Sequence, residues 1–166
     1  AKVELISGPV SINVPSEINL TKVETAQEMY DSVSKYLDVD YIIMCAAVSD
    51  YTPNKQSSKK IKGKDNHMIL DMKPTVDIVK SISKKTKATI VAFALETCNP
   101  KENAMKKMID KDVDYIALNH PNDDGCGIES NFNAITLFGK NGLKEIISKD
   151  RKDRVAKKIL EYVINQ

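Results

Sequence analysis

The 166-residue sequence lacks the features that define several classes of protein. It contains neither a Gly-x-x-x-x-Gly-Lys phosphate loop nor a Gly-x-Gly-x-x-Gly motif, so both glycine-rich nucleotide-binding fingerprints are missing. Its three cysteines are odd in number and have no Cys-x-x-Cys spacing, which supports neither a disulfide framework nor a zinc site and is typical of a reducing compartment. His67 and His120 have no partners at metal-ligand spacing, so we expect no metal site built from protein side chains.

The sequence also lacks a long apolar run and a large net charge. No segment is long and apolar enough to span a membrane, and the N-terminal residues are not a signal peptide, so we expect a soluble, cytoplasmic protein that does not bind membranes. A formal charge of +2 gives no argument for nucleic acid as a partner. Apolar residues make up 42% and charged residues 29%, so we expect one globular domain over residues 1–166.

Strand patterns alternate with helix patterns along the chain. Strands are predicted at residues 2–6, 18–23, 41–45, 68–72, 88–94 and 114–118, and a hairpin at 134–138 and 143–147 around Asn141-Gly142. The run at 88–94 is almost wholly apolar, as in a strand buried on both faces. The alternation predicts an α/β fold with a Rossmann-like, three-layer, mostly parallel sheet and an antiparallel hairpin near the C-terminus.

Four helices are expected between and after these strands. Thr25 and Glu28 form a capping box that starts the first, Pro74 precedes the second, Asn99 and Pro100 supply a cap and a first residue for the third, and the fourth starts near residue 150. The predicted inward residues are Ala26, Met29, Tyr30, Val33 and Leu37; Val76, Val79 and Ile82; Ala104, Met105, Met108 and Ile109; and Val155, Ile159, Leu160 and Val163.

Polar residues follow three of the predicted parallel strands, at residues 46–50, 95–97 and 119–120. Ligands of open α/β sheets bind outside the carboxyl ends of the strands, so these segments are expected to share one rim. Asp50 is either a ligand of a ribose hydroxyl, a base amine or a metal, or a turn carboxylate that caps Tyr51 or Thr52. The lysine-rich residues 59–64 either bind phosphates or form a solvated loop.

Further residues carry two interpretations each. Lys107 and Lys111 share a helix face and either reach a cleft or solubilise the surface. Phe93 is either a core residue or a base-stacking residue, and Asn119 and Asn133 are either hydrogen-bond donors or turn residues. The Tyr-x-x-x-Lys pattern at residues 51–55 matches short-chain dehydrogenases, but it includes a proline that argues against the required helix, so we reject it.

Several motifs in the same order and spacing make the chain resemble phosphopantothenoylcysteine synthetase, the ligase half of the bifunctional coenzyme A biosynthesis flavoprotein. The motifs are Ser7-Gly8-Pro9, Thr25-Ala26-Gln27-Glu28, Ala46-Ala47-Val48-Ser49-Asp50, Lys60-Ile61-Lys62, Phe93-Ala94-Leu95-Glu96-Thr97 and Asn133-Ala134. The resemblance implies a CTP-dependent coupling of 4′-phosphopantothenate to cysteine through an acyl-cytidylate, with Mg²⁺ accompanying the nucleotide. It also implies a homodimer, and fusion to or association with the flavin-dependent phosphopantothenoylcysteine decarboxylase.

The resemblance also implies roles for particular residues. Asp50 would contact the sugar or base, Lys60 would stabilise charge during acyl-cytidylate formation as the catalytic lysine, and Lys107 and Lys111 would neutralise phosphates. The implied nucleotide-binding residues are Cys45, Ala46, Asp50, Lys60, Val76, Asp77, Ile78, Val79, Phe93, Lys107 and Lys111, and the implied substrate-binding residues are Ala47 and Asn119.

The sequence departs from the family pattern in two places. Residues 76–79 differ from the usual Asn-Pro-Asp-Ile, and the segment that family members carry before Ser-Gly-Pro, with an Asn that serves amide formation, is not in this sequence. The resemblance therefore implies an N-terminally truncated CTP-binding domain whose turnover is incomplete. Two alternatives are a Rossmann-type NAD(P)-dependent oxidoreductase and a non-catalytic dimerising module; the first needs the glycine fingerprint that is missing.

Overall fold

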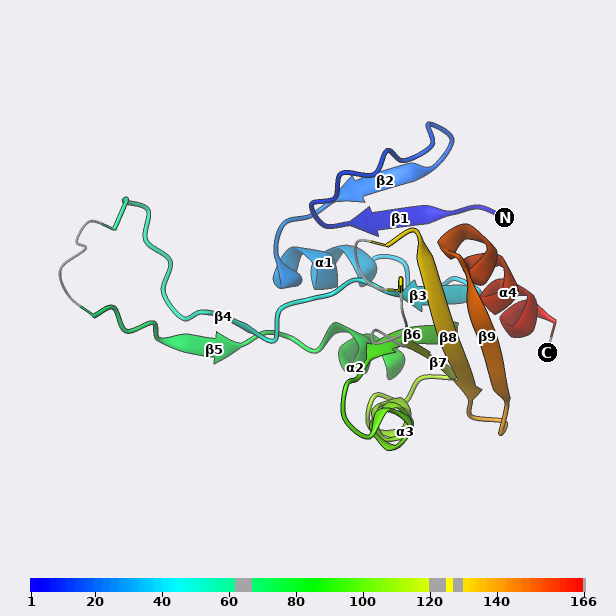
Figure 1. Cartoon of the computed structure of the whole chain (residues 1–166). Coiled ribbons are helices and arrows are strands. Elements are labelled where there is room, and N and C mark those ends of the chain that lie inside the picture. The colour runs from blue at the N-terminus through cyan, green and yellow to red at the C-terminus, as the bar shows by residue number, and fades with distance from the viewer. Residues whose placement is uncertain (62–66, 120–124, 127–129, 166) are drawn as a thin grey trace. The chain divides into compact units, whose positions relative to one another are not determined.

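The computed structural model describes residues 1–61, 67–119, 125–126 and 130–165, and these residues divide into two compact units. The N-terminal unit contains residues 1–36 and 46–78, and the sheet unit contains residues 37–45 and 79–166 (Figure 1). Part of the lysine-rich segment 59–64, most of the polar loop at 122–131 and His120 lie outside the described residues.

The sheet unit is built on five strands in the order β3-β6-β7-β8-β9. The strands are β3 (Tyr41–Met44), β6 (Thr89–Leu95), β7 (Tyr115–Asn119), β8 (Phe132–Gly139) and β9 (Lys144–Arg151). Strands β3, β6 and β7 pair in parallel, whereas β8 is antiparallel to both β7 and β9. This arrangement confirms the predicted Rossmann-like α/β fold and its C-terminal hairpin.

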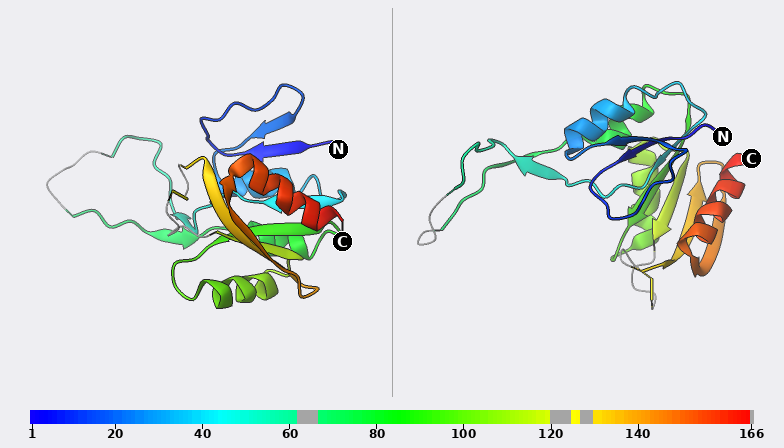
Figure 2. Two further views of the ribbon diagram at one scale, coloured as in Figure 1. Left: turned by 45° about the vertical axis from the view of Figure 1, so that its right-hand side comes forward. Right: turned by 90° about the horizontal axis from the view of Figure 1, so that it is seen from above.

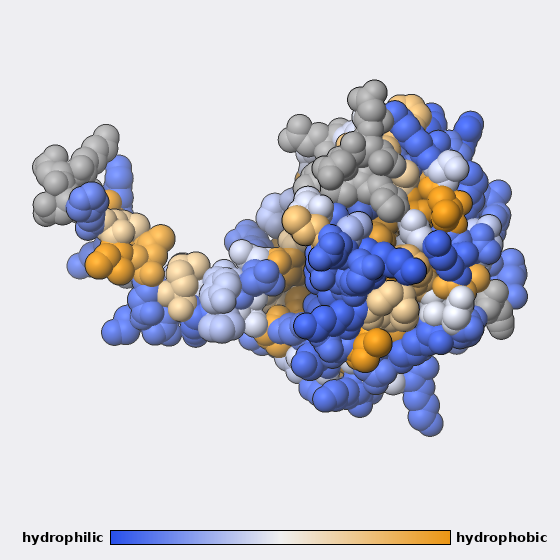
Figure 3. All heavy atoms as spheres, turned by 60° about the horizontal axis from the view of Figure 1, so that its bottom comes forward, coloured by the Kyte–Doolittle hydropathy of each residue, from blue (hydrophilic) through white to orange (hydrophobic). Residues whose placement is uncertain are grey.

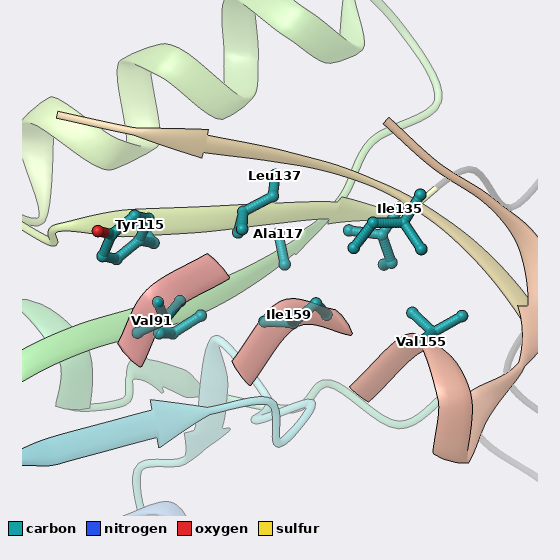
Figure 4. Close-up of a cluster of buried hydrophobic side chains, with 9 residues drawn as sticks. Val91, Tyr115, Ala117, Ile135, Leu137, Val155 and Ile159 are labelled. Atoms are coloured by element: carbon teal, nitrogen blue, oxygen red, sulfur yellow. The ribbon is translucent and has the colours of Figure 1, made fainter. Parts of the chain in front are cut away.

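Helices cover both faces of this sheet. Helix α3 (Pro100–Asp110) and helix α4 (Lys152–Ile164) lie on opposite sides of the strands (Figures 1 and 4). Helix α4 buries Val155, Ile159 and Val163 against a cluster from four strands (Figure 4). The strand members of this cluster are Val91, Tyr115, Ala117, Ile135, Leu137 and Ile147.

β6 is buried on both faces of the sheet, which explains the nearly continuous apolar run in its sequence. Ile90, Val91, Ala92 and Ala94 are all buried, so consecutive side chains are covered on both faces of the sheet. Val91 belongs to the cluster beneath α4, and the residues on either side of it point to the face that carries α3 because side chains alternate along a strand. β6 is therefore a central strand of the unit.

In its described residues, the N-terminal unit contains two small sheets and one helix. β1 (Glu4–Ser7) and β2 (Asn19–Lys22) pair in parallel, and β4 (Tyr51–Pro53) pairs antiparallel with β5 (Met72–Pro74). β4 and β5 lie side by side as a narrow ribbon (Figure 2). The surface of this ribbon is partly hydrophobic (Figure 3). Since Tyr51–Pro53 is a strand, the helix that the dehydrogenase pattern requires is absent there.

Helix α1 (Ala26–Val33) begins with the predicted capping box. The Glu28 amide donates to Thr25 Oγ1 at 3.1 Å, and the Thr25 amide donates to Glu28 Oε2 at 3.1 Å. These two bonds satisfy amides that a helix start would otherwise leave unpaired. The helix buries Met29 and Val33 as expected, but it ends before Leu37.

The structure corrects several predicted elements. Residues 68–71 form no strand and β5 starts only at Met72, because the alternating side chains there are exposed and have no core to face. The short helix α2 (Ile78–Ser83) buries Ile78 and Ile82 rather than Val76 and Val79. Two predicted core residues are exposed: Ile109 at 71% and Leu160 at 39%.

The third helix starts at Pro100, as predicted, but its cap differs from the prediction. Asn99 has φ 43° and ψ 52°, in the left-handed region, and its side chain makes no capping hydrogen bond. A side chain oxygen caps a helix from extended backbone, so this conformation removes the capping geometry. The proline at the first helical position remains, and its fixed φ favours the helix start.

Candidate site at the carboxyl edge of the sheet

The carboxyl ends of β3, β6 and β7 form one edge of the sheet unit because the three strands are parallel. Met44 pairs with Ala92, and Leu95 pairs with Asn119, so β6 and β7 end together. Cys45 and Glu96 directly follow β3 and β6, and Asn119 is the last residue of β7. The ends of the three strands therefore share one edge, as expected. Of the three rim segments that the sequence predicts, residues 46–50 belong to the N-terminal unit and His120 lies outside the described residues.

The two faces of the sheet carry different predicted ligands at this edge. Phe93 lies two residues after Val91, and Asn119 lies two residues after Ala117. Both side chains are therefore on the face of the sheet that packs against α4. Phe93 is half-buried and packs against the core cluster there. Its aromatic ring therefore serves the core, and its contact with a base stays a prediction.

Lys107, predicted to neutralise phosphates, forms an ion pair with Glu96 on the α3 side. Asn103 Nδ2 donates to Glu96 Oε2 at 3.2 Å and to the Cys98 carbonyl at 2.8 Å. The Glu96 side chain is 15% exposed and that of Lys107 is 47% exposed, so the acid is the more enclosed partner. The Glu96 carboxylate thus binds the side chains of Asn103 and Lys107, which lie four residues apart on one face of α3.

Glu96 lies in the expected rim segment 95–97, but no binding role is predicted for Glu96 or Asn103 from the sequence. Two signals in the sequence point to them: a carboxylate directly after a buried strand, and an Asn placed four residues before a lysine on one helix. Lys111 is placed differently, because it is the C-cap of α3 and its amide donates to the Lys107 carbonyl. It lies at the far end of the helix from Pro100, which follows the carboxyl edge.

Asn119 and Asn133 are joined across β7 and β8. Asn133 Nδ2 donates to Asn119 Oδ1 at 2.8 Å, and the Ala134 amide donates to Asn133 Oδ1 at 3.0 Å. Both asparagines are half-buried at the carboxyl edge. The structure therefore places them in a hydrogen-bonded pair, beyond the separate donor or turn roles considered from the sequence.

The N-terminal unit contains most of the remaining predicted ligands, in segments of which two meet there; Cys45 and Val79 belong to the sheet unit. The Thr75 amide donates to the Asp50 carbonyl at 2.9 Å, and Thr75 Oγ1 donates to the Ser49 carbonyl at 2.5 Å. These bonds tie the stretch at residues 46–50 to the stretch at 76–78. Both stretches were predicted to contact the nucleotide.

Asp50 itself is exposed. Within the described ranges its carboxylate forms no hydrogen bond, so the turn-capping interpretation has no support in the structure. Lys60 is also exposed. Both side chains are thus accessible from solvent, which a ligand-binding role requires, and their roles stay predictions.

Cys45, predicted to contact the nucleotide, is exposed as a residue, yet desolvation of the sulfur raises the pKa of its thiol. A raised pKa keeps the thiol protonated at neutral pH, which disfavours a nucleophilic role because the thiolate is the reactive form. In the part of the chain that the structure describes, no three His, Cys, Asp or Glu side chains gather as metal ligands. No helix in the described ranges is long and apolar enough to cross a membrane.

The sheet and its polar carboxyl edge define a mixed α/β domain of Rossmann-like type. The family model for the "DNA/pantothenate metabolism flavoprotein C-terminal domain" matches residues 1–166. A crystal structure of the C-terminal domain of the coenzyme A biosynthesis bifunctional protein CoaBC superposes with a TM-score of 0.80 at 31% identity, covering 98% of this chain and 72% of that chain. The chain belongs to the family of the DNA/pantothenate metabolism flavoprotein C-terminal domain.

Curated proteins with similar sequences have two different names. The coenzyme A biosynthesis bifunctional protein CoaBC of Vibrio vulnificus is 39% identical over 151 residues, which are 88% of this chain and 38% of that protein. A protein named cysteine/cysteine sulfinic acid decarboxylase, from an unknown prokaryotic organism, is 36% identical over 168 residues, 99% of this chain and 47% of that protein. The chain spans less than half the length of these curated relatives, and the resemblance drawn from the sequence motifs is confirmed at the level of the family.

Proposed function

We propose that this chain acts in coenzyme A biosynthesis as a CTP-dependent phosphopantothenate–cysteine ligase domain. The observation that carries the proposal is the match of all 166 residues to the family model, together with the likeness to the C-terminal domain of CoaBC. The motifs that the chain shares with the synthetase family indicate the reaction. The polar carboxyl edge is the place where α/β sheets usually bind ligands.

The proposed reaction has two steps. The carboxylate of 4′-phosphopantothenate attacks the α-phosphorus of CTP, the bond to the β-phosphate breaks, and pyrophosphate leaves. The amine of cysteine then attacks the acyl carbon of the acyl-cytidylate, CMP leaves, and the amine loses a proton as the amide forms. Both steps increase negative charge on oxygen, so cationic and hydrogen-bonding groups stabilise them.

The motifs shared with the family indicate which side chains take part in these steps. Lys60 stabilises the charge that develops as the acyl-cytidylate forms, and Asp50 binds the sugar or base of CTP. Lys107 reaches the phosphates when it exchanges Glu96 for a phosphate oxygen, since one ammonium group can pair with either anion. Magnesium would accompany CTP and neutralise phosphate charge, since Mg²⁺ is usually held mainly by substrate phosphates and needs few protein ligands.

The proposal extends to the assembly. The protein works in the cytoplasm as a homodimer. It is fused to or associated with the flavin-dependent decarboxylase; the word bifunctional in the name of relatives such as the CoaBC of Vibrio vulnificus supports this second point. Pull-down of the decarboxylase by this chain and the mass of the complex in solution test both points. A monomer that binds no decarboxylase would refute this part alone.

The decisive experiment compares Lys60→Gln with Lys59→Gln, a neighbouring exposed lysine that lies outside the Lys60-Ile61-Lys62 motif. Pyrophosphate release from CTP and phosphopantothenate should fall by a factor of at least about 100 in Lys60→Gln, as expected for loss of one group that stabilises developing charge. Lys59→Gln should keep the activity of the unmodified chain. Equal activity in both variants would contradict the assignment of Lys60.

A second assay separates the proposed reaction from the alternatives. The relative named as a cysteine/cysteine sulfinic acid decarboxylase makes CO₂ release from cysteine the competing activity. NADPH binding would indicate the oxidoreductase alternative, and binding of neither nucleotide would indicate a non-catalytic module. We expect CTP to bind, NADPH not to bind, and pyrophosphate rather than CO₂ to appear.

A further inference from the structure

The pair Asn119–Asn133 has a defined direction of hydrogen bonding. An asparagine amide offers an acceptor oxygen and a donor nitrogen, and the two are told apart only by their partners. Here the Ala134 backbone amide, which can only donate, lies 3.0 Å from one end of the Asn133 side chain. That end must be Oδ1, so the Asn133 NH₂ group faces Asn119.

The orientation of the Asn133 amide also fixes the orientation of the Asn119 amide. Because Asn133 presents its NH₂ group, the Asn119 atom 2.8 Å away must be the acceptor Oδ1. The NH₂ group of Asn119 is then the outer end of the chain of hydrogen bonds. No described residue accepts a hydrogen bond from it.

An irregularity in the pairing of β8 with β9 lies beside Asn133. Asn133 pairs with Asp150 and Ile135 pairs with Ile147, so β9 carries one extra residue here and Ala134 has no partner residue in the ladder. Such bulges redirect side chains and occur often beside active sites. The bulge gives the Ala134 amide to the Asn133 side chain, which fixes one end of the chain of hydrogen bonds to the backbone.

We propose that Asn133 is a positioning residue that holds the Asn119 NH₂ group as a hydrogen-bond donor to an anionic oxygen of the substrate at the carboxyl edge. This inference rests on the proposed ligase function. The oxygen belongs either to the acid substrate or to CTP, since carboxylate and phosphate oxygens are equivalent acceptors for an amide donor. Asn119 touches the substrate, whereas Asn133 acts only through Asn119.

Two isosteric substitutions separate this role from a purely structural link between β7 and β8. In Asn133→Asp the carboxylate still accepts from the Ala134 amide but cannot donate, so Asn119 turns and offers its carbonyl oxygen to the ligand. In Asn119→Asp the bond from Asn133 is kept, but the outer donor becomes a carboxylate oxygen. A structural role predicts little change for Asn119→Asp, because the link between the strands remains.

The expected effect is a change in substrate affinity. Loss of one hydrogen bond to a charged oxygen should raise the KM of the recognised substrate roughly tenfold or more in both variants, with kcat less affected. A KM change confined to phosphopantothenate assigns the oxygen to the acid, and one confined to CTP assigns it to the nucleotide. Because the new charge of each aspartate also repels anions, the comparison is repeated at high salt, where screening removes long-range repulsion but leaves the loss of the donor.

A second readout needs no turnover. In ¹⁵N-labelled protein, adding phosphopantothenate or CTP separately should shift the side-chain NH₂ resonances of Asn119, and Asn133→Asp should abolish that shift. If the unmodified chain binds a substrate while the Asn119 signals stay unchanged, or if Asn133→Asp leaves KM unchanged, the inference is overturned and the proposed function stands. If the unmodified chain binds neither substrate, the proposed function and the inference fail together.

Discussion

The two units of this protein differ in how their structure is held. In the sheet unit, all five strands and both long helices contribute buried apolar side chains. The N-terminal unit buries four apolar residues among those described: Val23, Met29, Val33 and Ile78. Its segment 68–72 instead exposes Met68, Ile69, Leu70 and Met72, and local hydrogen bonds such as the capping box hold its helix start. Hydrophobic packing therefore stabilises the sheet unit, and local bonds have the larger share in the N-terminal unit.

The largest effect should come from Leu137→Ala in β8. Leu137 is fully buried in the cluster beneath α4, and removing its side chain leaves a cavity, so the free energy of unfolding of the sheet unit should fall by about 2–5 kcal/mol. The matched control is Leu20→Ala in β2, where the leucine is 37% exposed and the loss should stay below about 1 kcal/mol. Urea unfolding monitored by hydrogen exchange in each unit measures both, and equal losses would remove the contrast between the units.

A middle effect is expected at the helix starts. Thr25→Ala breaks the capping box of α1 and should cost about 1 kcal/mol, measured from exchange of the α1 amides. Asn99→Gly should change stability by less than about 0.5 kcal/mol, because Asn99 makes no capping bond and glycine accepts a positive φ readily. A larger cost for Asn99→Gly than for Thr25→Ala would show that local capping matters more in the sheet unit.

The smallest effect concerns ion pairs. A double-mutant cycle with Glu96→Gln and Lys107→Gln should give a coupling of about 1 kcal/mol, near the upper end for surface pairs, because the Glu96 side chain is only 15% exposed. The pair Lys2–Glu4 of the N-terminal unit should give a smaller coupling, since Lys2 is 84% exposed and solvent screens the pair. Thermal unfolding of the four variants of each cycle supplies the coupling energies. Equal couplings would mean that enclosure of the acid has no effect.

The same contrast explains how much of the fold the sequence predicts. The apolar run of β6, the Asn141-Gly142 turn and the capping box at Thr25 each depend on neighbouring residues alone, and all three are confirmed. Residues 68–71 alternate like a strand, yet they remain exposed, because alternation forms a strand only where a partner surface is present. Ile109 and Leu160 fit a helical stripe but lie beyond the area that the sheet covers.

The candidate site divides in the same way. That the ends of β3, β6 and β7 share one edge follows from the α/β pattern and is predictable. The ion pair of Lys107 with Glu96 and the amide pair of Asn119 with Asn133 depend on contacts between distant segments. The second pair also lies beside a bulge, in which β9 carries one extra residue opposite Ala134, and no local sequence pattern predicts this irregularity.

The two edge strands of the five-stranded sheet have opposite character. β9 carries charged side chains along its length, including Lys144, Glu145 and Lys149, and such charges prevent strands of different molecules from pairing. β3 consists of four uncharged residues, of which Tyr41 and Ile43 are 40% and 42% exposed. Aggregation of the concentrated protein is therefore expected to start at β3, and a lysine in place of Ile43 would be the first substitution to try for better solubility.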